Sequence, residues 1–162
     1  MSEEGLSWRH AVTTGVVVLI PSYAGLRLWS EGGRAMPQNS WFAVAIIVLM
    51  AVAILVAAGE IHRYVEGKST VLPTPQRARR TVVGAQATVI GGGAAAGWYL
   101  AQALVHIPNA DVDSVRSSLT LAAVLTLASA GLSAAGLVAQ AWCKNPPEDD
   151  DPDDKRRPPE PA

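Results

Sequence analysis

The sequence predicts an all-α fold: an integral membrane four-helix bundle followed by a disordered, acidic and proline-rich C-terminal tail. The 162 residues are 49% apolar, and their mean hydropathy is +0.21. The apolar residues gather into four long runs, and the charged residues lie mostly between and after these runs. Such segregation is typical of a chain that divides itself between lipid and water.

The four apolar runs approach or exceed the length needed to cross a hydrocarbon core, which is about 20 residues of helix. Each span is expected to be helical, because lipid offers the backbone no hydrogen-bond partners. The predicted membrane domain covers residues 1–143 and the predicted tail covers 144–162. The predicted spans cover residues 10–29, 41–59, 81–107 and 118–142.

The first run, 10–29, has a rival interpretation as a cleaved signal peptide. Its Ser22-Tyr23-Ala24 segment resembles a signal-peptidase site that follows an apolar stretch. Against this interpretation, Arg9 is the only positive charge before the run, and a signal peptide usually begins with a positively charged region. Cleavage would leave a mature protein with three spans.

The connections between the runs predict how the helices pair. Residues 31–40 and 108–118 are short connections, which predict antiparallel neighbours within the first and the last pair. The middle connection, 60–80, is longer and basic. After the fourth run, residues 148–154 hold six acids and 155–157 are basic. This tail cannot bury enough apolar surface to fold, and the alternative to a solvated tail is a docking peptide for a basic partner.

The positive charges predict the orientation, because cytoplasmic segments carry an excess of lysine and arginine. Ten positive charges fall at the two ends of the chain and in the middle connection, and three fall on the opposite side. The sequence therefore predicts a multi-pass protein of the plasma membrane with both termini in the cytoplasm. Five basic residues, which either set this orientation or contact anionic lipid headgroups, form a basic collar: Arg63, Lys68, Arg77, Arg79 and Arg80.

Small residues recur at helical spacing in the third and fourth runs, and helices in lipid associate through such residues. The predicted packing residues are Gly84, Thr88, Gly92, Gly93, Ala96 and Gly97 in the third run and Ser129 and Ser133 in the fourth. The third and fourth helices are therefore expected to cross closely, and homodimerisation is the alternative use of the same residues. Gln86 and Gln140 are expected to form an amide pair across this interface, worth about 1 kcal/mol.

The sequence assembles no convincing catalytic, cofactor or metal site. The formal net charge of −1 gives no indication of nucleic-acid binding, and a single cysteine excludes an intrachain disulfide. The spacing Gly91-x-Gly93-x-x-Ala96 fits a dinucleotide fingerprint, but that motif works only between a buried strand and a helix. We therefore expect no cofactor, no metal and no nucleic acid.

Two segments carry a family resemblance. Leu72-Pro73-Thr74-Pro75-Gln76-Arg77-Ala78-Arg79-Arg80-Thr81 leads into the small-residue run, and Trp142-Cys143-Lys144-Asn145-Pro146-Pro147 precedes the acidic tail. With these segments the chain resembles an uncharacterised actinobacterial family of small membrane proteins, a domain of unknown function whose genes often lie beside folate-biosynthesis genes. The resemblance implies four spans, the plasma membrane and no established activity. It also implies contact between Gln86 and Gln140, positions that are often lysine and glutamate in that family.

These features favour a non-enzymatic membrane scaffold or accessory subunit that binds an unidentified protein partner. The alternative is a small transporter or channel for a neutral solute, which four short spans would form only as a homo-oligomer. No Asp, Glu or Lys lies inside a predicted span, and this argues against ion coupling. A membrane enzyme is the third hypothesis, for which the sequence offers no residues.

Overall fold

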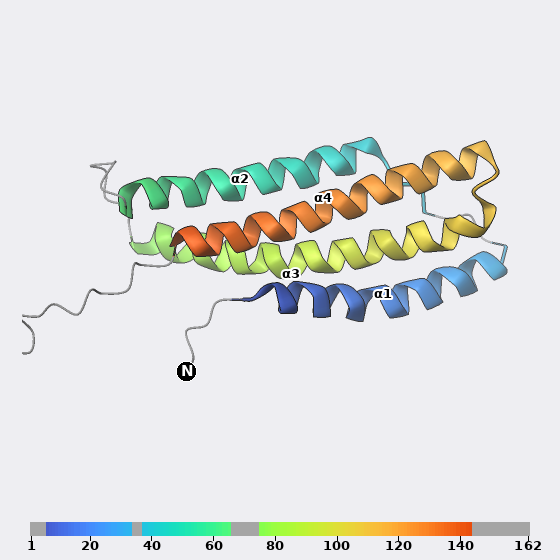
Figure 1. Ribbon diagram of the computed structural model, residues 1–162, viewed down its shortest axis with the longest axis horizontal. Coiled ribbons are helices and arrows are strands. Elements are labelled where there is room, and N and C mark those ends of the chain that lie inside the picture. The colour runs from blue at the N-terminus through green and yellow to red at the C-terminus, as the bar shows by residue number, and fades with distance from the viewer. Residues whose placement is uncertain (1–5, 34–36, 66–74, 144–162) are drawn as a thin grey trace, which may run out of the picture.

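The computed structural model describes residues 6–33, 37–65 and 75–143. Its helices are α1 (Trp8–Glu31), α2 (Trp41–Val65), α3 (Pro75–His106), the 3-10 turn η1 (Ile107–Asn109) and α4 (Asp113–Cys143) (Figure 1). The predicted all-α fold is confirmed for the described residues. The tail that the sequence predicts at 144–162 lies outside them.

Local chemistry sets the helix ends. The backbone N–H of Ser7, just before α1, donates to Nδ1 of His10 at 3.2 Å, which satisfies an amide that the first turn leaves unpaired. After α1, Gly33 takes a φ of 69°, a conformation that glycine adopts without strain. α3 begins with Pro75, whose missing N–H is no loss at the first helical position.

The four long helices form an open row instead of a closed bundle. α3 packs between α1 and α4, and α2 packs mainly on the other side of α4, so the order across the molecule is α1, α3, α4, α2 (Figure 1). The described residues of α1 and α2 make no contact with each other. The predicted pairing of the first two helices is therefore wrong, and the predicted pairing of the last two is confirmed.

The described residues just before α2, 37–40, lie against the end of α3. Nδ2 of Asn39 donates to Oε1 of Gln102 at 2.6 Å, and Gln102 is only 2% exposed. A buried polar group needs such a partner, because an unpaired amide in a protein interior costs about 1–3 kcal/mol. This bond therefore holds the connection against α3.

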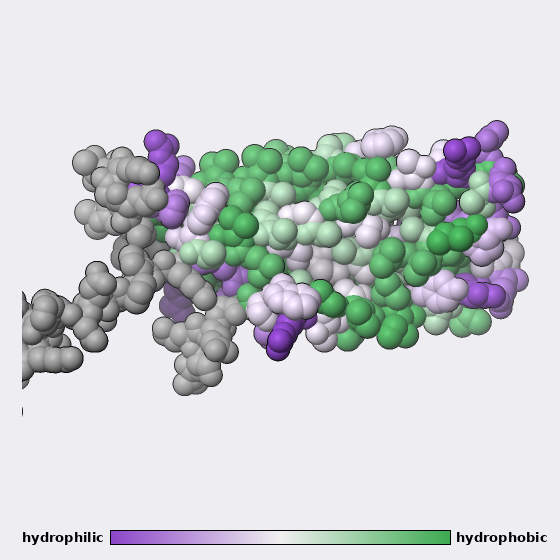
Figure 2. Space-filling view, in the orientation of Figure 1, coloured by the Kyte–Doolittle hydropathy of each residue, from purple (hydrophilic) through white to green (hydrophobic). Residues whose placement is uncertain are grey.

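Three of the described helices are long and apolar enough to cross a membrane: α1, α2 and α4. Figure 2 shows the corresponding apolar band over the middle of one face, with polar residues at both ends. The prediction of four such helices is wrong for α3, although α3 has 32 residues. Glycines and the amides of Gln86 and Gln102 lower its mean hydropathy. α3 tolerates these residues because it packs between α1 and α4.

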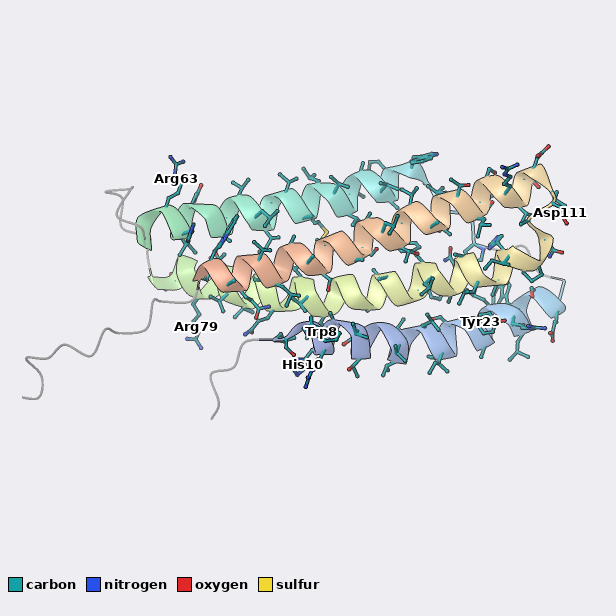
Figure 3. All side chains as sticks on the ribbon, in the orientation of Figure 1. Trp8, His10, Tyr23, Arg63, Arg79 and Asp111 are labelled. Carbon is teal, nitrogen blue, oxygen red and sulfur yellow. The ribbon has the colours of Figure 1, made fainter. Side chains whose placement is uncertain are left out.

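The helix ends define two ends of the molecule. At the terminal end, α2 ends, α3 begins and α4 ends (Figure 1). α1 begins farther along the molecule, because Ala11 lies against Gly93, past the middle of α3. At the loop end lie the α1–α2 connection and η1. Figure 3 shows Arg63 and Arg79 at the terminal end and Asp111 at the loop end. The described residues that flank the middle connection, and the described end of α4, thus lie at one end of the molecule.

Candidate functional site

The α3–α4 crossing brings two backbones together at Gly92. A Cβ built on Gly92 would lie 2.6 Å from the backbone N of Ser133 and 2.9 Å from the carbonyl oxygen of Ser129. Across the same crossing, Oγ of Ser133 donates to the carbonyl oxygen of Val89 at 2.6 Å. The structure therefore places three of the predicted packing residues in one interface, where only glycine fits on α3.

Gly136 makes the reciprocal approach from α4. A Cβ there would lie 2.8 Å from the carbonyl oxygen of Ala85 and 3.0 Å from the backbone N of Val89. Ala85 and Val89 are both fully buried. Sequence spacing pointed to the serines of α4 and did not single out Gly136, although Ser129, Ser133 and Gly136 fall on one helical face.

Gly93 and Gly97 face α1 and not α4. A Cβ on Gly93 would overlap the carbonyl oxygen of Ala11, and one on Gly97 would overlap the carbonyl oxygen of Gly15. Gly15 in turn approaches the Gly93 carbonyl oxygen, at 3.1 Å from a built Cβ. These contacts join backbone to backbone, which is how small residues let transmembrane helices associate closely.

The remaining predicted packing residues have looser surroundings. A Cβ on Gly84 would lie 3.5 Å from Cδ1 of Ile54 on α2, an ordinary contact. Thr88 is half-buried and donates to the Gly84 carbonyl oxygen at 2.7 Å within α3, and Ala96 is also half-buried. Gly91 faces open space. The small residues of α3 therefore contact three helices, α1, α2 and α4, instead of α4 alone.

The structure does not bring the predicted amide pair together. Gln140 is 6% exposed, and neither Nε2 nor Oε1 has a hydrogen-bond partner among the described residues. The reason is the register of the crossing. Gly136 lies level with Ala85, so Gln140 lies about one turn nearer the terminal end than Gln86 does. The two amides are therefore offset along the interface.

The described part of the basic collar lies at the terminal end. Arg63 is exposed on the last turns of α2, and Arg79 and Arg80 are exposed near the start of α3 (Figure 3). Lys68 and the side chain of Arg77 lie outside the described residues. The exposed guanidinium groups are placed where a chain in a bilayer would meet the headgroup layer.

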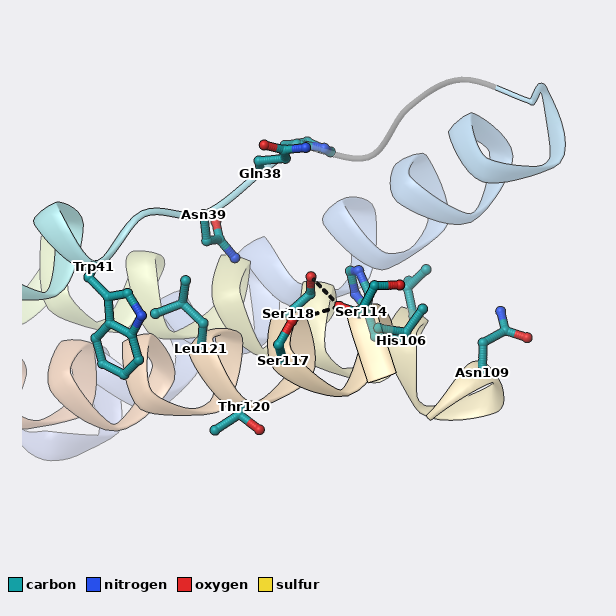
Figure 4. Close-up of a pocket in the computed structure, with 13 residues that line it drawn as sticks. Gln38, Asn39, Trp41, His106, Asn109, Ser114, Ser117, Ser118, Thr120 and Leu121 are labelled. Atoms are coloured by element: carbon teal, nitrogen blue, oxygen red, sulfur yellow. Dashed lines mark hydrogen bonds between the residues drawn. The ribbon is translucent and has the colours of Figure 1, made fainter. Parts of the chain in front are cut away.

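A polar pocket of about 800 Å³ opens at the loop end, between the end of α3, the start of α4 and the α1–α2 connection (Figure 4). None of the described residues that line it is an acid, a lysine or an arginine. Hydroxyl, amide and imidazole groups line it beside an indole: Gln38, Asn39, Trp41, His106, Asn109, Ser114, Ser117, Ser118 and Thr120.

The hydrogen bonds inside the polar pocket leave acceptor atoms on Ser117, Ser118 and His106. The hydroxyls of Ser117 and Ser118 donate to the Ser114 carbonyl oxygen at 2.9 and 3.1 Å, so their oxygens keep lone pairs. Nδ1 of His106 lies 2.6 Å from the Gln102 carbonyl oxygen. A carbonyl only accepts, so Nδ1 carries the proton and Nε2 of the neutral ring is an acceptor. The described hydrogen bonds therefore do not form a serine–histidine nucleophile.

An apolar pocket of about 520 Å³ lies beside the C-terminal half of α1, also at the loop end. It is hollow because Gly25 has nothing within 4 Å of a built Cβ, one turn after Pro21. Trp29 and Trp98 form its aromatic walls. Pro37 of the α1–α2 connection lines this pocket as well as the polar pocket.

Sequence reasoning singled out neither pocket. One signal was present, because Ser114, Ser117 and Ser118 are spaced to put three hydroxyls on one face of a helix. Among the described residues, no group of three or more His, Cys, Asp or Glu side chains could hold a metal ion.

Comparison with known proteins gives the family. A family model described as a protein of unknown function, DUF3180, matches residues 11–147, which is most of the 162-residue chain. No curated protein and no solved structure matches it. The matched range contains the four spans that the sequence predicts, apart from residue 10 at the start of the first span. It also contains the basic middle connection. The chain therefore belongs to the DUF3180 family of proteins of unknown function.

Proposed function

We propose that the protein is a multi-pass protein of the plasma membrane and that all four long helices cross the bilayer. α3 lies between α1 and α4, which are both apolar enough to span. Its 32 residues extend about 48 Å, more than a hydrocarbon core of about 30 Å. Gly92, Gly97 and Gln102 are buried against protein, and this supports a span that is sheltered from lipid.

The proposed orientation puts the terminal end in the cytoplasm, since Arg63, Arg79 and Arg80 lie there. Thiol labelling tests it in a Cys143→Ser background. A cysteine in place of Asn109, at the loop end, should react with an impermeant maleimide in intact cells. A cysteine in place of Gln76, at the terminal end, should react only after the cells are opened. The opposite pattern would reject the orientation.

Within this membrane domain we propose a non-enzymatic scaffold or accessory subunit. The observation that supports it is a closely packed core: Gly92 contacts the α4 backbone, and Gly93 and Gly97 contact the α1 backbone. The largest fully buried side chains, Leu125 and Val89 among them, also lie along this core. A solute could pass through a single chain only if these contacts parted.

Photo-crosslinking tests the scaffold proposal in native membranes. α2 is the helix to probe, because it packs at one edge of the row and Leu49 is 68% exposed. A photoreactive amino acid at Leu49, expressed at the native level, should give a reproducible adduct with one protein. The matched control is the same amino acid at exposed Leu127 of α4. Adducts with lipid alone from both positions would contradict the proposal.

Mass and flux measurements separate the scaffold from the alternative carrier for a neutral solute. A carrier made of several copies predicts a stable homo-oligomer, and the glycines of α3 are already used within the chain. Light scattering should instead find a protein mass near 17.0 kDa, that of one chain. A dimer that also transports a neutral solute in liposomes would favour the carrier.

A further inference from the structure

The two pockets at the loop end share a wall. Pro37 lines the polar pocket, of about 800 Å³, and the apolar pocket, of about 520 Å³. Two residues later, the bond from Asn39 to Gln102 holds the connection against α3. Both volumes fall within the range of about 300–1,000 Å³ that small-molecule sites occupy. One molecule with a polar part and an apolar part would have to pass Pro37 to occupy both pockets.

The polar pocket selects the chemistry of the polar part. Its hydroxyl oxygens and Nε2 of His106 accept hydrogen bonds. The amides of Gln38 and Asn109 and Nε1 of Trp41 can donate them. An ionised phosphate or carboxylate would need a cation to balance its charge, and none of the described lining residues is one. Hydroxyl groups both donate and accept hydrogen bonds and carry no charge.

Two of these side chains favour a sugar among hydroxylated groups. The amide of Asn109 can donate as well as accept, which matches the mixed hydrogen bonding of a sugar ring. Trp41 presents an indole ring to the pocket and is 64% exposed (Figure 4). The apolar face of a sugar ring can pack on such an aromatic surface.

The apolar pocket indicates the chemistry of the ligand's apolar part. Pro21 and Gly25 lie one turn apart on α1 and leave a hollow beside Leu26, which is 6% exposed. Trp29 and Trp98 close it with aromatic carbon. In the proposed membrane placement this hollow opens beside the acyl chains of the lipids. An acyl chain is therefore the apolar group that we expect to occupy it.

We propose that the two pockets bind one membrane glycolipid with an uncharged sugar headgroup. The headgroup occupies the polar pocket, one acyl chain occupies the apolar pocket, and Pro37 lies between them. This inference rests on the proposed membrane placement, but its test in detergent does not. Failure of lipid binding and failure of the labelling experiment are therefore distinguishable.

Native mass spectrometry of the full chain tests the proposal. The protein should be released from a polyoxyethylene detergent, because a maltoside is itself a sugar amphiphile and would compete. Four probes with matched acyl chains or headgroups are added: glucosyl diacylglycerol, phosphatidylglycerol, diacylglycerol and methyl glucoside. We expect at least ten-fold more retained glucosyl diacylglycerol than any other probe.

Two variants locate the site. Gly25→Leu should fill the apolar pocket without a steric conflict, and Gly131→Leu on α4 is its control, since neither glycine has an atom within 4 Å of a built Cβ. Ser118→Leu should block the polar pocket. Its control is Ala123→Leu, at an exposed position five residues farther along α4. Each blocking variant should reduce retention at least ten-fold, and each control should retain the lipid.

Several results would overturn the proposal. Equal retention of phosphatidylglycerol would show that an uncharged headgroup is not selected. Equal retention of diacylglycerol would show that the headgroup does not bind. Retention of methyl glucoside alone would assign a free sugar and not a lipid. Wild-type retention by Gly25→Leu or Ser118→Leu, with far-UV circular dichroism confirming a folded protein, would place any bound lipid elsewhere.

Discussion

Replacing Gly92 by alanine tests the close packing at the α3–α4 crossing. The new Cβ would lie 2.6 Å from the backbone N of Ser133. To reach an ordinary contact of 3.4 Å, the two helices would have to part locally by about 0.8 Å. The opposing atoms belong to the α4 backbone, so no side chain can rotate away to relieve the conflict.

Two contributions set the size of the effect. Overpacking a well-packed interior costs about 1–3 kcal/mol. The same separation would stretch the bond from Ser133 to Val89 from 2.6 Å to about 3.4 Å, outside the usual range for a hydroxyl donor. Such an interhelical bond is worth about 0.6 kcal/mol in a membrane protein. We therefore expect Gly92→Ala to lower the free energy of unfolding by about 1.5–3.5 kcal/mol.

The preceding residue provides a matched control. Gly91 has no atom within 4 Å of a built Cβ, so Gly91→Ala should change the free energy of unfolding by less than about 1 kcal/mol, in the stabilising direction. Steric trapping in bicelles measures both variants at equilibrium. Equal losses for the two alanines, or no loss for Gly92→Ala, would refute the reasoning.

The remaining predictions use the same measurement. Ser133→Ala should cost about 0.6 kcal/mol with its interhelical bond. Ser129→Ala should cost nothing, because the buried Oγ of Ser129 has no partner, and a larger loss there would contradict the assignment. Gln140→Leu should raise stability by about 1 kcal/mol, since its unpaired buried amide is removed. Gln102→Leu should lower stability, because it removes the bond from Asn39. If both glutamine variants changed the free energy of unfolding in the same direction, these two predictions would be contradicted.

Apolar runs located the helices well and their ends less well. The run that starts at 41 coincides with the start of α2 at Trp41, but α2 continues to Val65. α3 begins at Pro75, before the predicted start at 81. Hydropathy marks the residues that suit the hydrocarbon core, whereas a helix also continues through polar turns at the interface.

Connection length did not determine which helices pair. The connection of residues 32–40 reaches at most about 30 Å when extended, and a helix is about 10–12 Å across. It can therefore turn back on α1 or cross to the far side of α4. The bond from Asn39 to Gln102 fixes the second route, and it joins residues 63 positions apart. Local sequence patterns do not reveal such a contact.

Small-residue spacing identified packing faces without identifying their partners. Gly92 and Gly93 are adjacent in sequence, but they face α4 and α1 respectively. Consecutive residues of a helix point about 100° apart, so the partner depends on which helices flank α3. The register along the crossing sets the offset of Gln86 from Gln140. A usable signal was the four-residue spacing of Ala11 and Gly15 in α1, which matches that of Gly93 and Gly97.

Paired cysteines in native membranes test the order of the helices, α1, α3, α4, α2. In a Cys143→Ser background, the Ala58 and Ala139 pair joins α2 to α4, and a scan of cysteine pairs around the contact of Gly15 with Gly93 joins α1 to α3. We expect oxidation to link α2 to α4 and α1 to α3, and a scan of cysteine pairs between α1 and α2 to give no link. Efficient links between α1 and α2 would show a closed bundle and contradict the account.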